Sequence, residues 1–111
     1  MQRVRTIYCF ASILALLLSF SLQAQKKQAF VSGKVVDENE NPLSNVSVMI
    51  LGRQSGITTS DSGTFRLSVP ADRAFAIVFS FTGYKTEQRN FLLAENEEER
   101  IVVRLERGTG S

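Results

Sequence analysis

Every second position is apolar, or carries a small residue, in four segments of this chain. They are residues 30–36, 46–50, 64–69 and 100–105, whose alternate members are Val31, Gly33 and Val35, then Val46, Val48 and Ile50, then Phe65, Leu67 and Val69, then Ile101, Val103 and Leu105. Such alternation places one face of a strand against a core and the other face in water. We therefore predict four half-buried antiparallel strands.

A fifth segment, residues 75–81, is apolar on both faces. One face carries Phe75, Ile77, Phe79 and Phe81, and the other carries Ala76 and Val78. A strand of this kind is usually central in its sheet and covered on both sides. We predict that it is not an edge strand and that Phe79, like Phe65, belongs to the core.

Turn-forming residues separate these segments. Pro42 has no amide hydrogen to donate and cannot continue a central strand. The stretch from Ser60 to Gly63 predicts a tight hairpin turn with Gly63 in the left-handed region, and Gly83 lies in another turn. About seven short strands, roughly 8–12 residues apart and without a helical pattern, predict an all-β fold, a seven-stranded antiparallel β-sandwich.

The first 24 residues have the pattern of a secretory signal peptide. Arg3 and Arg5 precede an apolar run over residues 7–20, and Ala24 supplies a small residue near the exit. The run is shorter than the roughly 20 residues that span a bilayer, so a retained membrane helix is the weaker interpretation. We predict a signal peptide (1–24), a polar lead-in (25–29), the sandwich domain (30–106) and a flexible tail or truncated linker (107–111).

Removal of the signal peptide changes the charge balance. The whole chain has 13 Lys and Arg against 11 Asp and Glu, and the loss of Arg3 and Arg5 leaves 11 of each. A domain with no net charge lacks the excess of basic residues that binding to nucleic acid requires.

The chain has no histidine, and its one cysteine, Cys9, leaves with the signal peptide. The usual general base, thiolate nucleophile and zinc ligands are therefore missing, and we predict no catalytic site, no metal and no cofactor.

Two features are candidate ligand sites. The segment 37–41 has oxygen ligands at alternate positions, but Pro42 and Val48 stand where the helix–loop–helix calcium motif needs glycine and glutamate. A looser calcium site stays open beside the simpler interpretation as a polar loop. For Tyr84 we favour a ring packed on the core, with its hydroxyl bonded to a backbone carbonyl, over a ligand contact.

Six motifs, in order and spacing, resemble the carboxypeptidase-regulatory-like domains over about Phe30 to Leu105. The motifs are residues 31–37, 41–43, 46–48, 56–59, 63–67 and 81–84. The resemblance implies a transthyretin-like (prealbumin-like) sandwich, Ig-like in general architecture and without catalytic residues. The chain departs from the family at Glu40, where glycine is usual, and at Ser60, where aspartate is usual and the acid has moved to Asp61.

The resemblance also implies a function. A domain of this family directly after a signal peptide resembles the periplasmic N-terminal extension of SusC-type TonB-dependent outer-membrane receptors of Gram-negative bacteria, which import nutrients. The expected partners are the rest of such a receptor and its periplasmic energising protein, with no nucleic acid and no membrane span in the mature domain. The alternative is a free-standing secreted or periplasmic module that binds glycan or peptide.

Strand edges are the remaining candidates for a contact site. The segment 85–90 is polar on both faces, and Lys85, Glu87 and Arg89 alternate along it. We predict that this segment and residues 30–36 are the least protected edges. An edge strand offers unpaired amides and carbonyls to a partner strand, although charges on it also discourage aggregation, and we favour the second role.

Overall fold

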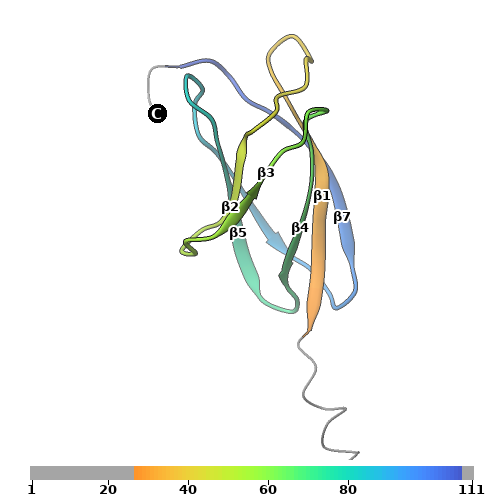
Figure 1. Cartoon of the computed structure of the whole chain (residues 1–111). Helices are drawn as coiled ribbons and strands as arrows, with labels where there is room; N and C mark the ends of the chain where they lie inside the picture. The colour runs from red at the N-terminus through yellow and green to blue at the C-terminus, as the bar shows by residue number, and fades with distance from the viewer. Residues whose placement is uncertain (1–26, 109–111) are drawn as a thin grey trace, which may run out of the picture.

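The computed structural model describes residues 27–108, so the predicted signal peptide lies outside the described part. The described chain forms seven strands in two packed sheets (Figure 1). The strands are β1 (Gln28–Val36), β2 (Ser47–Ile50), β3 (Gly56–Thr58), β4 (Thr64–Pro70), β5 (Ala74–Ser80), β6 (Glu87–Leu92) and β7 (Glu98–Arg104). The prediction of an all-β, seven-stranded sandwich is confirmed. Within residues 27–108, no helix is long and apolar enough to cross a membrane.

The two sheets have the strand orders β4-β1-β7 and β3-β2-β5-β6. All pairs are antiparallel except one: β7 runs parallel to β1, in a register from Phe30 opposite Glu98 to Val36 opposite Arg104. Alternation in a sequence determines which side chains share a face but not the direction in which a strand runs. The fully antiparallel arrangement expected from the sequence is therefore wrong at this pair.

The place of β1 corrects two further expectations. Because β1 lies between β4 and β7, the segment 30–36 is a central strand and not an unprotected edge. The strand also begins at Gln28, inside the predicted polar lead-in, and Ala29 is fully buried. The last residues of the lead-in therefore belong to the sandwich.

The core fills the space between the two sheets. Its members come from the inward faces of β1, β2, β4, β5, β6 and β7 and from the adjoining loops; the largest fully buried side chains are Phe79, Ile77, Leu105, Val31, Val35, Val46, Val48 and Val103. Phe79 packs edge to face on Phe65 across the sandwich, with ring centroids 5.5 Å apart. Edge-to-face geometry adds a favourable quadrupole contact to the burial.

The strand β5 lies between β2 and β6, as its sequence predicts. Its inward residues Ile77 and Phe79 are fully buried, whereas Ala76 and Val78 on the other face are only half-buried. The central position is confirmed, but the outer face of β5 is only partly shielded from solvent. The outer surface of this sheet is thus partly exposed and weakly polar.

Candidate interaction surface

Three of the turn residues singled out in the sequence hold the loops at one end of the sandwich. Gly63 has a φ of 77°, and a Cβ atom on it would lie 2.7 Å from the carbonyl oxygen of Val35. Pro42 forms an isolated bridge with Val36. In the hairpin turn, the Ser60 hydroxyl accepts a hydrogen bond from the Thr64 amide at 3.2 Å. Ser60 thus closes the turn where aspartate is usual in the family.

Two other glycines occupy different environments. Gly33 lies on β1 where the backbone of β7 approaches, and a Cβ atom there would collide with the Ile101 carbonyl oxygen. Gly83 has a φ of 90° in the turn that leads towards β6, and its carbonyl accepts the Gly108 amide at 3.1 Å. Gly33 therefore permits the close approach of β1 and β7, and Gly83 shapes a turn that contacts the C-terminal segment.

Tyr84 is half-buried and packs against the core. Its ring lies 5.7 Å from the ring of Phe81, and the Arg107 guanidinium lies 5.9 Å from its centroid. The packing is as expected, but the expected bond from the Tyr84 hydroxyl to a backbone carbonyl is not formed within residues 27–108.

The Asp37 loop is held by its own side chain. Asp37 Oδ1 accepts the amides of Asn39 at 2.8 Å and Asn41 at 2.9 Å. The Asn41 amide is the main cause of a lowered pKa of the Asp37 carboxyl. In the described chain, no three acidic, histidine or cysteine side chains are grouped as a metal site. The carboxylate shapes the loop by accepting its amides, which is the polar-loop interpretation.

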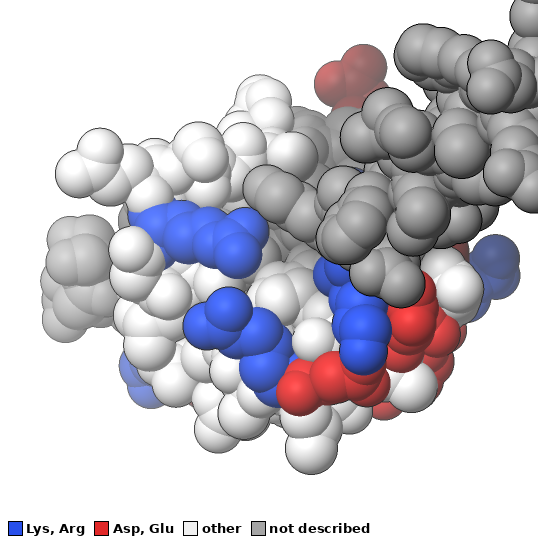
Figure 2. Space-filling view, turned by 90° about the horizontal axis from the view of Figure 1, so that it is seen from below, with Lys and Arg blue, Asp and Glu red and all other residues white. Residues whose placement is uncertain are grey.

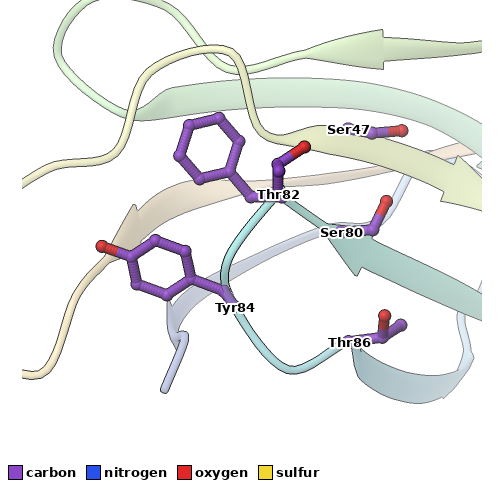
Figure 3. A pocket seen from close by; sticks show the side chains of 6 residues that line it. Ser47, Ser80, Thr82, Tyr84 and Thr86 are labelled. Carbon is purple, nitrogen blue, oxygen red and sulfur yellow. The ribbon is translucent and has the colours of Figure 1, made fainter. Parts of the chain in front are cut away.

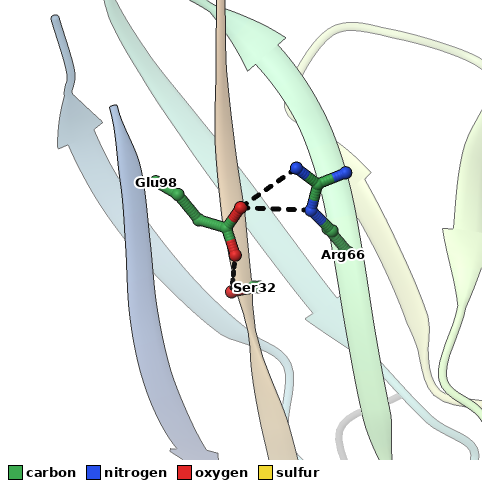
Figure 4. A network of polar contacts seen from close by, with 3 residues as sticks. All are labelled: Ser32, Arg66 and Glu98. Carbon is green, nitrogen blue, oxygen red and sulfur yellow. Dashed lines mark hydrogen bonds and ion pairs between the residues drawn. The ribbon is translucent and has the colours of Figure 1, made fainter. Parts of the chain in front are cut away.

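A polar network connects all three strands of the smaller sheet (Figure 4). Glu98 accepts the Ser32 hydroxyl at 2.9 Å on one oxygen and two Arg66 nitrogens at 3.0 and 3.1 Å on the other. The Ser32 hydroxyl, followed by Arg66, lowers the pKa of Glu98. The Arg66 guanidinium also lies 3.8 Å from the centroid of the Phe30 ring. Sequence reasoning missed this network, because its members meet only through the parallel β1–β7 register.

The outer faces of the two sheets differ in charge. The three-stranded sheet carries Lys34, Arg66, Glu98, Arg100 and Arg104 on its outer face. The strands of the four-stranded sheet carry only uncharged residues on theirs: Ser47, Met49, Gly56, Thr58, Ala74, Ala76, Val78, Ser80, Gln88, Asn90 and Leu92. At the lower end of the sandwich, acidic and basic side chains lie side by side (Figure 2). Lys27 and Asp72 form an ion pair at 3.6 Å. The absence of charged residues from the outer face of the four-stranded sheet is typical of the centre of a protein interface.

A small depression adjoins this uncharged face (Figure 3). Its volume is about 330 Å³, and it is lined by Ser47, Ser80, Phe81, Thr82, Tyr84 and Thr86. Five of these six side chains carry a hydroxyl group, and in Figure 3 the hydroxyls of Ser80 and Thr86 point in a similar direction. The depression therefore offers neutral donors and acceptors beside two aromatic rings.

The edge of β6 is the part of the predicted contact site that the structure leaves open. Within residues 27–108, β6 pairs only with β5. Glu87 and Arg89 lie on its inner face, opposite Phe79 and Ile77, and form an ion pair at 3.5 Å. Lys85 lies before the strand: its amide donates to the Glu106 carbonyl at 2.8 Å, and its Nζ lies 3.8 Å from Glu106 Oε2. Lys85 is thus bound to the C-terminal segment and is not part of the open edge.

The opposite side of the four-stranded sheet is less accessible. The edge strand there, β3, has three residues and contacts β4 of the other sheet. In the smaller sheet, the edge strand β7 begins with two adjacent acidic residues, Glu98 and Glu99, which face opposite sides of the sheet. A strand added to β7 would meet acidic side chains on both faces, whereas β6 has an uncharged outer face. Among the edges of β3, β6 and β7, the edge of β6 is therefore the best candidate contact site.

Comparisons with solved structures find the same fold. One match is the Bacillus anthracis TIE protein, with 15% identity over 73% of this chain and 17% of that chain and a TM-score of 0.60. A second is a type II cohesin–X-dockerin complex from Acetivibrio cellulolyticus, with 16% identity over 72% of this chain and 58% of that chain and a TM-score of 0.59. A third is 3-chlorocatechol 1,2-dioxygenase from Rhodococcus opacus 1CP, with 12% identity over 76% of this chain and 62% of that chain and a TM-score of 0.58.

At these identities the likeness shows the fold alone, and the chain spans less than two thirds of each of the three structures. No match is found among curated proteins. The sequence model of the CarboxypepD_reg-like domain matches residues 31–110, which include the turn residues described above and all of β2 to β7. The chain therefore belongs to the CarboxypepD_reg-like domain family.

Proposed function

We propose that this chain is a non-catalytic interaction domain that binds another polypeptide through the open edge of β6. The observation that carries the proposal is that edge: within residues 27–108 β6 pairs on one side only, and its outer face is uncharged. An extended segment that adds to such an edge gains main-chain hydrogen bonds, while pockets and charges on alternate positions select its sequence. Glu87 and Arg89 supply the charges.

The biological setting that fits this domain is the periplasm, at the N-terminal side of a TonB-dependent outer-membrane nutrient receptor. Membership of the CarboxypepD_reg-like family supports it, together with the signal-peptide pattern of residues 1–24. The partners are then the rest of the receptor and the periplasmic protein that energises it. The lack of histidine agrees with a role in binding and not in catalysis.

Two experiments test this proposal separately. Sequencing the gene beyond Ser111 tests the setting, because a receptor requires several hundred further residues of alternating amphipathic strands. Amide hydrogen exchange tests the binding role, with the chain measured alone and with the periplasmic part of an energising protein. We expect new protection confined to residues 87–92. Protection elsewhere, or no protection of β6 in either measurement at any concentration, rejects β6 as the contact site.

A second candidate function is a free-standing periplasmic module that binds a glycan or a peptide. The depression between Ser47 and Tyr84 favours it, because its hydroxyls suit a neutral polar ligand and its rings suit a sugar face. A stop codon after Ser111 favours this function over the receptor. Titration with neutral oligosaccharides, followed by NMR shifts of Ser80 and Thr86, tests it. No shift at millimolar concentration argues against a glycan site.

A further inference from the structure

The open edge of β6 needs an occupant with a free strand edge of its own. We propose that the occupant is β6 of a second copy of this chain. The two strands pair antiparallel about a two-fold axis at Gln88. The proposal rests on the proposed function only in taking this edge as the contact site. The two four-stranded sheets then form one continuous sheet. Its seam is formed by the residues around Gln88 in each copy.

The charges on the inner face of β6 are complementary to themselves in this register. Residues directly opposite in an antiparallel pair lie on the same face of the sheet, with Cβ atoms about 4.5–5.5 Å apart. An axis at Gln88 sets Glu87 opposite Arg89 of the second copy, and Arg89 opposite its Glu87. The two residues already form an ion pair within the chain, at 3.5 Å. The dimer converts two such pairs into a cluster of four alternating charges.

Neighbouring registers lack this complementarity. An axis one residue earlier sets Glu87 against Glu87 of the second copy, and an axis one residue later sets Arg89 against Arg89. Like charges directly opposite each other destabilise a strand pair. An axis between two residues would set an inward side chain against an outward one, which the pleat does not allow. The order of charges therefore selects one register.

The outer face and the length of the open edge agree with the same axis. On the outer face, Gln88 lies opposite Gln88 of the second copy and Thr86 lies opposite its Asn90, so only neutral hydrogen-bonding groups meet. Within the chain, Gln88 Nε2 already donates to Asn90 Oδ1 at 3.3 Å. The Lys85 amide is bonded to Glu106, which ends the open edge just before Thr86. Five residues, 86 to 90, are then paired symmetrically about Gln88.

A charge-swap experiment tests the register. We expect Glu87→Arg alone, or Arg89→Glu alone, to raise the dimer dissociation constant about tenfold or more in sedimentation equilibrium, because each change creates two like-charge pairs at the seam. The double variant, Glu87→Arg with Arg89→Glu, restores the opposite-charge pairs and therefore the dimer. Glu95→Arg, in the exposed β6–β7 turn, makes the same charge change away from the seam and should leave the constant unchanged. A dimer that is unaffected by the single changes overturns the proposal.

Disulfide capture tests the position of the axis. In a Cys9→Ser chain, Gln88→Cys places one thiol opposite its copy, and we expect a disulfide-linked dimer on mild oxidation. Asn90→Cys, on the same face two residues away, lies opposite Thr86 and should stay monomeric on a non-reducing gel. Equal cross-linking of both overturns the register. A chain that is monomeric at every concentration, yet gains β6 protection with a different polypeptide, overturns the dimer and leaves the proposed function intact.

Discussion

Glu40 is the position at which we expect a glycine to stabilise this domain. The residue has a φ of 68°, and it is the only residue with a positive φ in the described chain that is neither glycine nor Asn or Asp. The left-handed conformation costs an ordinary L-residue roughly 1–2 kcal/mol, and glycine adopts it freely. The usual glycine of the family at this position therefore has a conformational reason.

The magnitude follows from comparing Glu40→Gly with Glu40→Ala. Both variants lose the exposed ion pair between Glu40 and Arg104, so its contribution cancels. Glycine relieves the conformational cost but adds about 0.5–1 kcal/mol of unfolded-state entropy relative to alanine. The glycine variant should therefore be more stable than the alanine variant by about 0.5–1 kcal/mol. For a domain of this size, that difference raises Tm by about 2–8 °C.

Urea and thermal unfolding of four variants provide the assay. Asn39 lies next to Glu40 in the same exposed loop and does not have a positive φ, so Asn39→Gly and Asn39→Ala form the matched control. At Asn39 the order should reverse, with alanine more stable than glycine. The reasoning is refuted if alanine equals or exceeds glycine at position 40, or if the same order appears at both positions.

Three further predictions concern packing and charge. Gly33→Ala should cost several kcal/mol in urea unfolding, because the collision with the Ile101 carbonyl separates β1 from β7; a loss below about 0.5 kcal/mol would contradict this close approach. Phe79→Ala should cost about 3–5 kcal/mol through lost burial and a cavity, whereas Leu92→Ala, whose side chain is 68% exposed, should be nearly silent; similar losses at both positions would mean that the strand faces are misassigned. The lowered pKa of Glu98, caused first by the Ser32 hydroxyl, stabilises the fold above the ordinary glutamate pKa of about 4.3, and the contribution is lost as the pH falls below that value. Glu98→Gln should therefore flatten the fall in Tm between about pH 5 and pH 3, and an unchanged slope counts against the network.

Much of the fold follows from the sequence because burial has a simple period in strands. Alternation correctly placed Val31, Val48 and Leu67 on inward faces, and the doubly apolar segment 75–81 proved central. The turn residue Gly63 was likewise found from its neighbours, and its positive φ is confirmed. These features depend on local chemistry, which a sequence displays directly.

The features that could not be predicted depend on contacts between distant residues. The alternation of apolar and polar residues is the same whether β7 runs parallel or antiparallel to β1. The parallel pairing nevertheless brings Glu98 into hydrogen-bond contact with Ser32 and Arg66. The bond between the Lys85 amide and Glu106 similarly depends on the path of the chain after β7. Of the predicted contact residues, Glu87 and Arg89 therefore lie on the open edge and Lys85 does not.

The parallel pairing of β1 with β7 also determines how the domain responds to tension. The chain enters the sandwich at the lower end of β1 and leaves it beyond the upper end of β7 (Figure 1). A pull on the two ends of the chain therefore drives these neighbouring strands past each other along their length. The hydrogen bonds between β1 and β7, from Phe30 to Val36, are then loaded in shear. They share the force and must break together, and do not break one after another. This strand arrangement therefore makes the domain resistant to unfolding when force is applied through its two ends.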